Sequence, residues 1–505
     1  MSRAIIVRDG FDPVPSIAEL ASLTVTVTTT VPATASTEGV AVSIDGAVPA
    51  DLQLDRAALA AAGFTGAPGQ SLLVPGGARL LVAVGVGDPA ALDMASVRDA
   101  AAAYSNAAAR HGELVVSLEG LSGLGIDVAA QAVVEGVVLA RYGYGVLQRN
   151  AGGRTPLTAL TLVTSADSVD AATAGAERGR IFATAASLAR DLANSPPAHL
   201  TATRIAEVAV DLGATRGLEV EVFDRDALVE LGIGGLIAVN GGSAEPPRMV
   251  KLTYTPSSPS GAKLTLVGKG IMYDSGGISL KPSDAVHATM KTDMSGAGNV
   301  LAVMSALTAL DCPTAVTAYL MCTDNMPSGT ALNLGDVMTI RGGTTVEVMN
   351  TDAEGRLVMA DALVLAAEEP TDAIIDMATL TGACVVALGS RISGVLGNNQ
   401  ALVDQLTGAS ALTDEPLWQL PLTPRYRPQL NSEVADMKNM GGPMAGTITA
   451  ALFLSEFVGD VPWAHIDIAG TAQNEVPERW TPKGATGFGT RLLLEFILSF
   501  TGIPS

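Results

Sequence analysis

Two kinds of apolar segment alternate through the first third of the chain. Valine, leucine and threonine dominate four short segments that we predict to be strands, at residues 24–31, 80–87, 114–118 and 160–164. Two longer alanine-rich segments lie between them, at residues 97–111 and 127–142, and these have the composition of helices. Because strands and helices alternate, the pattern predicts a small α/β domain with a partly parallel sheet, which we place at residues 1–166.

A longer helical pattern follows this domain. From residue 168 onward, apolar residues recur with helical spacing as far as Asn194, and Pro196 and Pro197 come shortly afterwards. Proline cannot continue a helix, because it lacks the amide hydrogen and clashes with the preceding turn. We therefore predict that residues 167–194 form a helix that connects two domains.

The remaining residues, 195–505, again alternate between strand and helix patterns. Residues 264–267 and 315–321 are almost continuously apolar, which is typical of strands that are buried on both faces of a sheet. A chain of 505 residues is also too long for one small core. The predicted fold class is therefore α/β, with a smaller N-terminal domain and a larger C-terminal domain whose central mixed sheet is covered by helices.

Composition narrows the class of function. Apolar residues make up 48% of the chain, charged residues 16%, and the formal net charge is −21. An acidic surface disfavours binding to nucleic acid and to anionic membranes. Three cysteines cannot form a disulfide framework, and the first nine residues contain no apolar core of signal-peptide length. We therefore expect a cytoplasmic protein that does not bind membranes.

Two carboxylates at a strand-to-helix junction carry the clearest chemical signal. Residues 345–349 alternate like a strand and residues 357–366 are rich in alanine and leucine like a helix, with Asp352 and Glu354 between them. In an extended segment, side chains at i and i+2 point the same way, so both carboxylates could reach one site. Gly355 would let the backbone bend into the helix.

A second charged group lies upstream. Lys269 and Asp274 stand at the end of a predicted buried strand, where open α/β sheets form their ligand sites, and Asp293 follows. In a regular strand Lys269 and Asp274 would point to opposite faces, because they are five residues apart. A bulge at the two glycines that flank Lys269 would bring both side chains to one side.

The four acids would repel one another in one cleft unless cations lay between them. Two divalent ions bridged by carboxylates, as in many hydrolases, would remove this repulsion. The alternative is that each acid is an ordinary solvated loop residue. Only four histidines are present; His287 lies near the acids in the sequence, and His465 alternates along a predicted strand as a core hydrogen-bonding residue. The patterns of serine hydrolases and P-loop proteins are missing from the sequence.

The residues around this junction resemble a known family. Residues 350–357, Asn-Thr-Asp-Ala-Glu-Gly-Arg-Leu, resemble the signature octapeptide of the leucyl aminopeptidases, the M17 family of cytosolic metallopeptidases. Four further segments, at residues 267–282, 324–329, 378–383 and 463–470, resemble other segments of the same family. The resemblance covers roughly residues 180–500 and implies the family's two-domain α/β fold.

The resemblance also implies a site with two divalent ions, Mn²⁺ or Zn²⁺. The residues implied as metal ligands are Lys269, Asp274, Asp293, Asp352 and Glu354. Lys281 would polarise the scissile carbonyl, and Arg356 would hold a bicarbonate ion that acts as general base. The residues implied to line the pocket for the first side chain of the substrate are Met290, Thr379 and Gly382. The segment from Lys281 to Asp293 is one residue longer than the family spacing, and we place the extra residue in the loop 284–288.

The implied activity is removal of the N-terminal residue, preferably leucine or another apolar residue, from peptide substrates. The resemblance further implies a homohexamer. The alternative is a hexameric DNA-binding or structural protein in which peptidase activity is secondary or lost, although the acidic composition disfavours binding to DNA.

Overall fold

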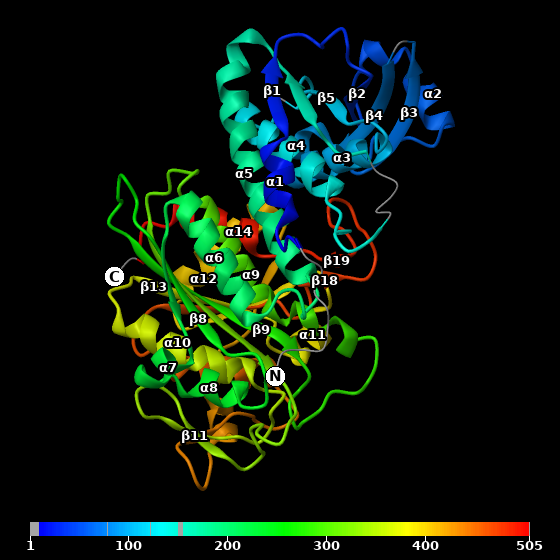
Figure 1. Cartoon of the computed structure of the whole chain (residues 1–505). Coiled ribbons are helices and arrows are strands. Elements are labelled where there is room, and N and C mark those ends of the chain that lie inside the picture. Colours follow the sequence, from blue (N-terminus) through cyan, green and yellow to red (C-terminus); the bar gives the residue numbers. More distant parts are fainter. Residues whose placement is uncertain (1–9, 78, 122, 150–154, 504–505) are drawn as a thin grey trace.

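The structure is a computed structural model that describes residues 10–77, 79–121, 123–149 and 155–503. It consists of a smaller and a larger α/β unit, and helix α5 (Val169–Asn194) runs from one to the other (Figure 1). The helix predicted from residue 168 to residue 194 is thus present, and it ends where Ser195 turns into extended backbone before Pro196. Residues 1–9 of the predicted N-terminal domain lie outside the described residues.

The smaller unit is built on a six-stranded sheet. Its strand order is β1-β6-β5-β2-β4-β3, and every neighbouring pair is parallel except β3 with β4. The strands are β1 (Thr24–Thr28), β2 (Thr37–Ser43), β3 (Ser71–Gly76), β4 (Arg79–Gly87), β5 (Glu113–Ser117) and β6 (Ala159–Val163). The partly parallel sheet is therefore confirmed, whereas the sequence pattern missed β2 and β3.

Four helices accompany this sheet: α1 (Pro15–Ala21), α2 (Arg56–Ala61), α3 (Met94–Ala107) and α4 (Ile126–Arg141). Helix α3 begins three residues before the predicted start, because Asp93 accepts a hydrogen bond from the Ser96 amide at 2.8 Å and Ser96 accepts one from the Asp93 amide at 3.1 Å. This reciprocal cap satisfies amide groups that would otherwise be unpaired in the first turn.

The larger unit is built on an eight-stranded mixed sheet, as predicted. Its strand order is β15-β14-β17-β13-β9-β10-β8-β7, with parallel pairs at the centre, antiparallel pairs farther out, and a parallel pair of β14 with β15 at one edge. The strands are β7 (Glu219–Phe223), β8 (Arg248–Tyr254), β9 (Lys263–Asp274), β10 (Ala315–Asn325), β13 (Ala373–Ala378), β14 (Ser393–Gly397), β15 (Leu417–Gln419) and β17 (Trp463–Asp467). Five short strands form two small sheets: β11 (Val337–Thr339), β12 (Thr345–Glu347), β16 (Met437–Lys438), β18 (Gln473–Asn474) and β19 (Gly484–Ala485).

Helices cover both faces of the central sheet. One face packs against α5, α6 (Ala202–Arg216), α9 (Ser295–Ala306), α12 (Gln400–Thr413) and α14 (Thr490–Ser499). The other packs against α7 (Arg225–Glu230), α8 (Gly234–Asn240), α10 (Gly355–Glu368) and α13 (Gly446–Ser455). Residues of β13 alternate between these two cores, with Ile375 and Met377 in the first and Ile374 and Ala378 in the second. No helix of the described residues has the length and apolar character needed to span a membrane.

An extra residue in β9 sets the direction of its last side chains. Thr323 of β10 lies opposite Ile271 and Asn325 opposite Asp274, so β9 advances by three residues where β10 advances by two. The irregularity brings Asp274 to the same side as Lys269. A bulge was expected, but at the glycines flanking Lys269; it lies between Ile271 and Asp274 instead. Gly268 and Gly270 serve close packing, since a Cβ at either position would lie within 3 Å of a neighbouring backbone.

A buried ion cluster joins the two units. Glu135 of α4 accepts from both Arg98 of α3 and Arg491 of α14 through the same Oε2 oxygen, each at 2.8 Å. All three side chains are at most 1% exposed. Because a carboxylate of the smaller unit is shared by a guanidinium of the larger unit, this contact ties the packing of the two units together.

Replacing Glu135 with alanine is expected to lower the free energy of unfolding by about 3–5 kcal/mol, because two buried guanidinium groups lose their shared partner. Chemical denaturation at pH 7 would measure this loss. The matched control is Glu207→Ala, which removes an exposed pair with Arg204 and should cost at most about 1 kcal/mol. Equal losses in the two variants would contradict the structural role of Glu135.

Candidate functional site

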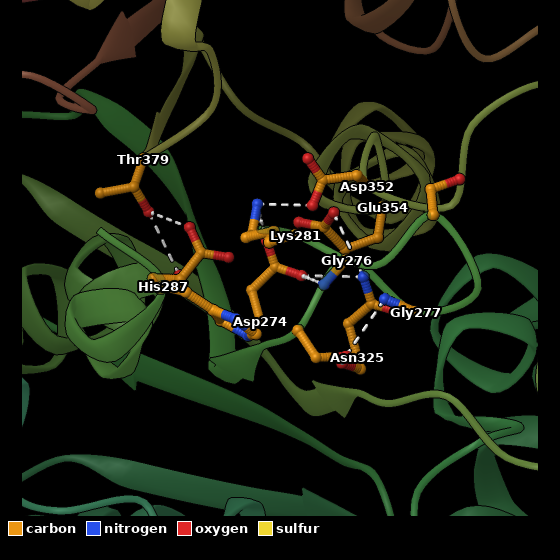
Figure 2. Close-up of polar contacts among 12 residues, drawn as sticks. Asp274, Gly276, Gly277, Lys281, His287, Asn325, Asp352, Glu354 and Thr379 are labelled. Carbon is orange, nitrogen blue, oxygen red and sulfur yellow. Dashed lines mark hydrogen bonds and ion pairs between the residues drawn. The ribbon is translucent and has the colours of Figure 1, made fainter. Parts of the chain in front are cut away.

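Three acidic side chains converge at the C-terminal end of β9. Asp274 is the last residue of β9, and Asp352 and Glu354 lie just before α10. A carboxylate oxygen from each lies within 4.8 Å of one from each of the others. Figure 2 shows these three carboxylates directed toward one another, with Lys281 beside them. The sequence predicted this convergence from two separate segments.

Two lysines lie among the acids. The Lys281 ammonium is 2.8 Å from Asp274 Oδ2 and 2.5 Å from Asp352 Oδ1. The Lys269 ammonium is 2.8 Å from both Asp293 Oδ2 and Glu354 Oε1, and it donates to the Thr379 carbonyl at 2.9 Å. All the charged residues implied as ligands, together with Lys281, therefore lie in one connected cluster.

The strand-to-helix junction differs in detail from the prediction. The strand ends at Glu347, and the Ala353 amide donates to the Asn350 carbonyl at 3.3 Å, so the acids converge through a turn rather than along an extended segment. Gly355 is the first residue of α10 and is needed for space: a Cβ there would lie 2.6 Å from Cε of Lys269. The expectation that Gly355 bends the backbone is replaced by this close approach of Lys269.

Hydrogen bonds from neighbouring residues fix Asp274. The Asn325 amide donates to Asp274 Oδ1 at 2.8 Å and to the Thr351 carbonyl at 2.9 Å, so it holds the two acidic segments together. The Gly276 amide also donates to Asp274 Oδ1, at 2.9 Å (Figure 2). The sequence analysis gave Asn325 no role. Its position at the end of β10, the strand next to β9, was the available signal.

Burial and mutual repulsion control the ionisation of the acids. Burial is the main cause that raises the pKa of Asp274 and of Asp293, and the neighbouring Glu354 adds to it. Burial, followed by Asp274 and Glu354, raises the pKa of Asp352 to about 6. For Glu354 burial is the largest single cause and would raise the pKa, but the charge and hydrogen bond of Lys269 together with the charge of Lys281 lower it. Like charges in so small a space favour a cation between them.

The acid cluster fits a divalent ion. Its donors are carboxylate oxygens from the buried Asp274 and Glu354 and from the partly exposed Asp352, with Asp293 and the Lys269 amine alongside. Such a mainly oxygen donor set suits Mn²⁺, Zn²⁺ or similar ions. For Lys269, burial alone would lower the pKa, but Asp293, Glu354 and Asp274 together raise it, so the amine is protonated when carboxylates are its only partners.

Arg356 lies in the first turn of α10, two residues after Glu354. Its Nη1 group donates to the Asn439 carbonyl at 2.8 Å, and its buried Nε group has no hydrogen-bond acceptor among the described residues. Burial lowers the pKa of Arg356 to about 10, against the opposing charges of Glu354 and Asp467. Asn439, which the sequence analysis missed, also bonds the Met349 amide at 2.8 Å and thereby fixes the turn.

Of the three residues implied for the substrate pocket, Thr379 contacts this cluster directly. The Thr379 hydroxyl donates to Asp293 Oδ1 at 2.8 Å. Met290 is half-buried in the 3₁₀ segment His287–Met294 that carries Asp293, and Gly382 is the exposed first residue of α11 (Gly382–Leu388). Their contact with a substrate side chain stays a prediction.

The resemblance places one extra residue in the loop 284–288, and Asp293 lies in the cluster. Residues 282–286 are exposed, so a change in length there does not disturb the packed part of the site. His287, at the end of this loop, stacks on Tyr273 with ring centroids 5.9 Å apart. His465 is fully buried and pairs with Asp376, which confirms its predicted role as a core hydrogen-bonding residue.

Comparison with known proteins gives matches over most of the chain. The model of the cytosol aminopeptidase family, catalytic domain, matches residues 187–494, and that of the same family's N-terminal domain matches residues 45–150. A probable cytosol aminopeptidase of Syntrophotalea carbinolica is 42% identical over 445 residues, covering 86% of this chain and 89% of the relative. One from Chlorobaculum tepidum is 48% identical over 340 residues, covering 67% of each chain.

A solved structure shares the whole architecture. The bottromycin maturation enzyme BotP in complex with Mn is 39% identical, with a TM-score of 0.85, covering 92% of this chain and 100% of its own. The same enzyme in a second structure gives a TM-score of 0.84 over 92% of this chain and 99% of its own.

Proposed function

Because this chain belongs to the cytosol aminopeptidase family, we propose that it uses two divalent metal ions to remove N-terminal leucine and other apolar residues from peptides. Family membership makes it a metal-dependent aminopeptidase, a hydrolase of peptide bonds. The observation that carries the finer proposal is the convergence of four acids and two lysines, from segments far apart in the sequence, at one buried place.

We assign the ligands according to the resemblance to the family. Lys269, Asp293, Asp274 and Glu354 would hold one ion, while Asp274, Asp352 and Glu354 would hold the other. The ions would lower the pKa of a water molecule and would bind the free α-amine of the substrate. Lys269 must be neutral to act as a ligand, and the positive charge of a bound ion would favour loss of its proton.

Lys281 is suited to act on the substrate carbonyl. Burial alone would lower its pKa, but Asp274 and Asp352 outweigh burial and raise it, so the ammonium stays charged. Its side chain is 18% exposed, more than that of Lys269 at 3%, and can therefore approach a bound peptide. A fixed ammonium beside the carbonyl oxygen would stabilise the negative charge that develops during attack by water.

The requirement for a free α-amine gives a direct test of exopeptidase activity. Leucine p-nitroanilide is expected to be cleaved, and N-acetyl-leucine p-nitroanilide at least about tenfold more slowly, because acetylation removes the amine that would bind the metal. Release of p-nitroaniline measures both rates. Equal rates on the two substrates would exclude an aminopeptidase mechanism.

Arg356 would hold a bicarbonate ion as general base, since the described acids near the site are already engaged as ligands or ion-pair partners. Adding bicarbonate to a carbonate-free buffer is expected to raise kcat about tenfold or more in the wild type, within the usual range for general base catalysis. Arg356→Met should show no such activation while keeping its metal content. Activation of both proteins to the same extent would remove Arg356 from this role.

Peptide substrates, assembly as a homohexamer and a cytoplasmic location remain predictions that accompany this proposal. The alternative of a hexameric DNA-binding or structural protein is disfavoured by the net charge of −21. Retention of Lys281 and Arg356 beside the acid cluster also speaks against a protein that has lost its activity.

A further inference from the structure

A pocket separate from the acid cluster lies where the larger unit meets the smaller one. It encloses about 220 Å³. Charged side chains surround it, namely Arg391, Asp414, Glu478 and Arg479, and the aromatic side chains of Trp480 and Phe488 form its apolar wall. The loop between β18 and β19, which carries three of these residues, lies beside α3 in Figure 1. Domain junctions are common places for small-molecule sites.

A strained turn presents two of the pocket residues. Glu478 and Thr481 exchange both backbone hydrogen bonds, at 2.9 and 2.8 Å, so Arg479 and Trp480 form a two-residue turn. Arg479 adopts a φ of 53°, in the left-handed region that a side chain of its size rarely occupies. Backbone strain of this kind persists where the surroundings enforce it and is concentrated at ligand sites.

The turn is held by contacts to both units. Arg479 pairs with Asp414 and with Asp99 of α3, each at 3.2 Å, and its carbonyl accepts from Asn106 at 3.4 Å. The Trp480 carbonyl accepts from Arg190 of α5 at 3.4 Å. Any group bound in the pocket would therefore touch a turn that contacts both units.

The rim offers one charge of each sign to a ligand. Arg391 pairs with Glu478 at 3.1 Å, and their side chains are 75% and 39% exposed, so either can move to meet a bound group. An exposed pair of this kind contributes little to stability. A ligand with both a carboxylate and an ammonium group can satisfy both partners at once.

The wall offers an apolar surface. Trp480 is 7% exposed and Phe488 is 9% exposed, so a small part of each side chain borders the pocket. The guanidinium of Arg491 lies 4.2 Å from the ring centroid of Trp480 and helps to hold the ring in place.

We propose that this pocket binds a free α-amino acid with an apolar side chain. The carboxylate would meet Arg391, the ammonium would meet Glu478, and the side chain would lie on Trp480 and Phe488. The volume equals that of roughly seven water molecules in the liquid, which suits a ligand of this size. The proposal rests on the proposed function only in that such amino acids are the products of the reaction.

A short path connects the pocket to the catalytic cluster. Gln473, the first residue of β18, donates to the Thr289 hydroxyl at 3.0 Å. Thr289 belongs to the segment His287–Met294 that carries Asp293. Because β18 pairs with β19 on either side of the strained turn, hydrogen bonds link the pocket turn to this segment.

Tryptophan fluorescence tests the proposal without relying on activity. The chain has only three tryptophans, Trp418, Trp463 and Trp480, and only Trp480 lines the pocket. Titration of the metal-loaded protein with L-leucine is expected to give a saturable change in emission that is lost in Trp480→Phe and kept in Trp418→Phe. Arg391→Ala, an exposed position that leaves the fold intact, should weaken binding at least tenfold.

Two analogues define the ligand class. L-Leucinamide lacks the carboxylate and 4-methylpentanoate lacks the amine, and each is expected to bind at least tenfold more weakly than leucine. Equal binding of 4-methylpentanoate would overturn the amino-acid assignment in favour of a plain anion site. No emission change, or the same change in Arg391→Ala, would overturn the site itself. Leucine binding by a protein that does not cleave leucine p-nitroanilide would refute the proposed function and leave the pocket standing.

Discussion

Removal of divalent ions by a chelator is expected to abolish cleavage of leucine p-nitroanilide, and Mn²⁺ or Zn²⁺ is expected to restore it. Four carboxylates and two lysines meet at the site, so the protein's own cations balance only half of the full negative charge. A bound ion contributes several kcal/mol to the transition state, so kcat/KM should fall roughly 10³-fold or more.

A substitution of one assigned ligand tests the same requirement for metal. Glu354→Gln should lose metal, measured by elemental analysis after gel filtration, together with activity, because Glu354 contacts Lys269 and is a ligand in both assigned ion sites. Glu369→Gln is the matched control: Glu369 lies at the other end of α10, where it pairs with Lys251 and Tyr319. Full metal content and full rate in Glu354→Gln would refute the assigned metal site.

Lys281→Ala is expected to keep both ions and to lower kcat about 10²–10³-fold, the usual effect of losing one group that stabilises an oxyanion. The ion-pair contacts of Lys281 are the two carboxylates Asp274 and Asp352, which the metal ions would take over, so its removal should not disturb the metal site. Steady-state kinetics and metal analysis on the same preparation separate the two effects.

Two further variants sharpen the test of Lys281. Lys281→Arg should recover part of kcat, because a cation remains, although the guanidinium cannot take the same place as the ammonium. Lys263→Ala removes an exposed lysine at the opposite end of β9 and should leave kcat unchanged. An unchanged kcat in Lys281→Ala would remove the electrophilic role, and loss of metal from it would make Lys281 a structural residue.

The central sheet and the connecting helix could be predicted because their patterns are long and strongly apolar. The two missed strands of the smaller unit have weaker patterns for physical reasons. Gly39 interrupts the strand-forming sequence pattern of β2. Glycine is needed there because a Cβ would lie 2.9 Å from the ring of Tyr104. Pro75 lies in β3, which is an edge strand of the sheet and therefore tolerates a residue without an amide hydrogen. Tertiary contacts, which the local pattern does not contain, explain both.

The charged residues of the site were predictable, whereas their supports were not. Charged side chains are costly to bury, so acids and lysines near predicted buried strands indicate a site. The family resemblance assigned them roles. Asn325 and Asn439 are neutral amides that hold backbone and carboxylate groups far away in sequence. An asparagine in a loop is most often a turn residue, so only the folded arrangement distinguishes these two from the rest.

The number of residues in a segment therefore matters little in one part of the site and is decisive in another. The family resemblance predicts one additional residue in the exposed loop between Lys281 and Asp293, and both charged residues lie in the cluster. In β9 the single additional residue between Ile271 and Asp274 decides which face Asp274 occupies. A deletion there would leave every residue assigned to the site in the sequence and yet turn the Asp274 carboxylate away from Lys281. The number of residues between motifs, and not only the motifs, thus helps to determine the geometry of this site.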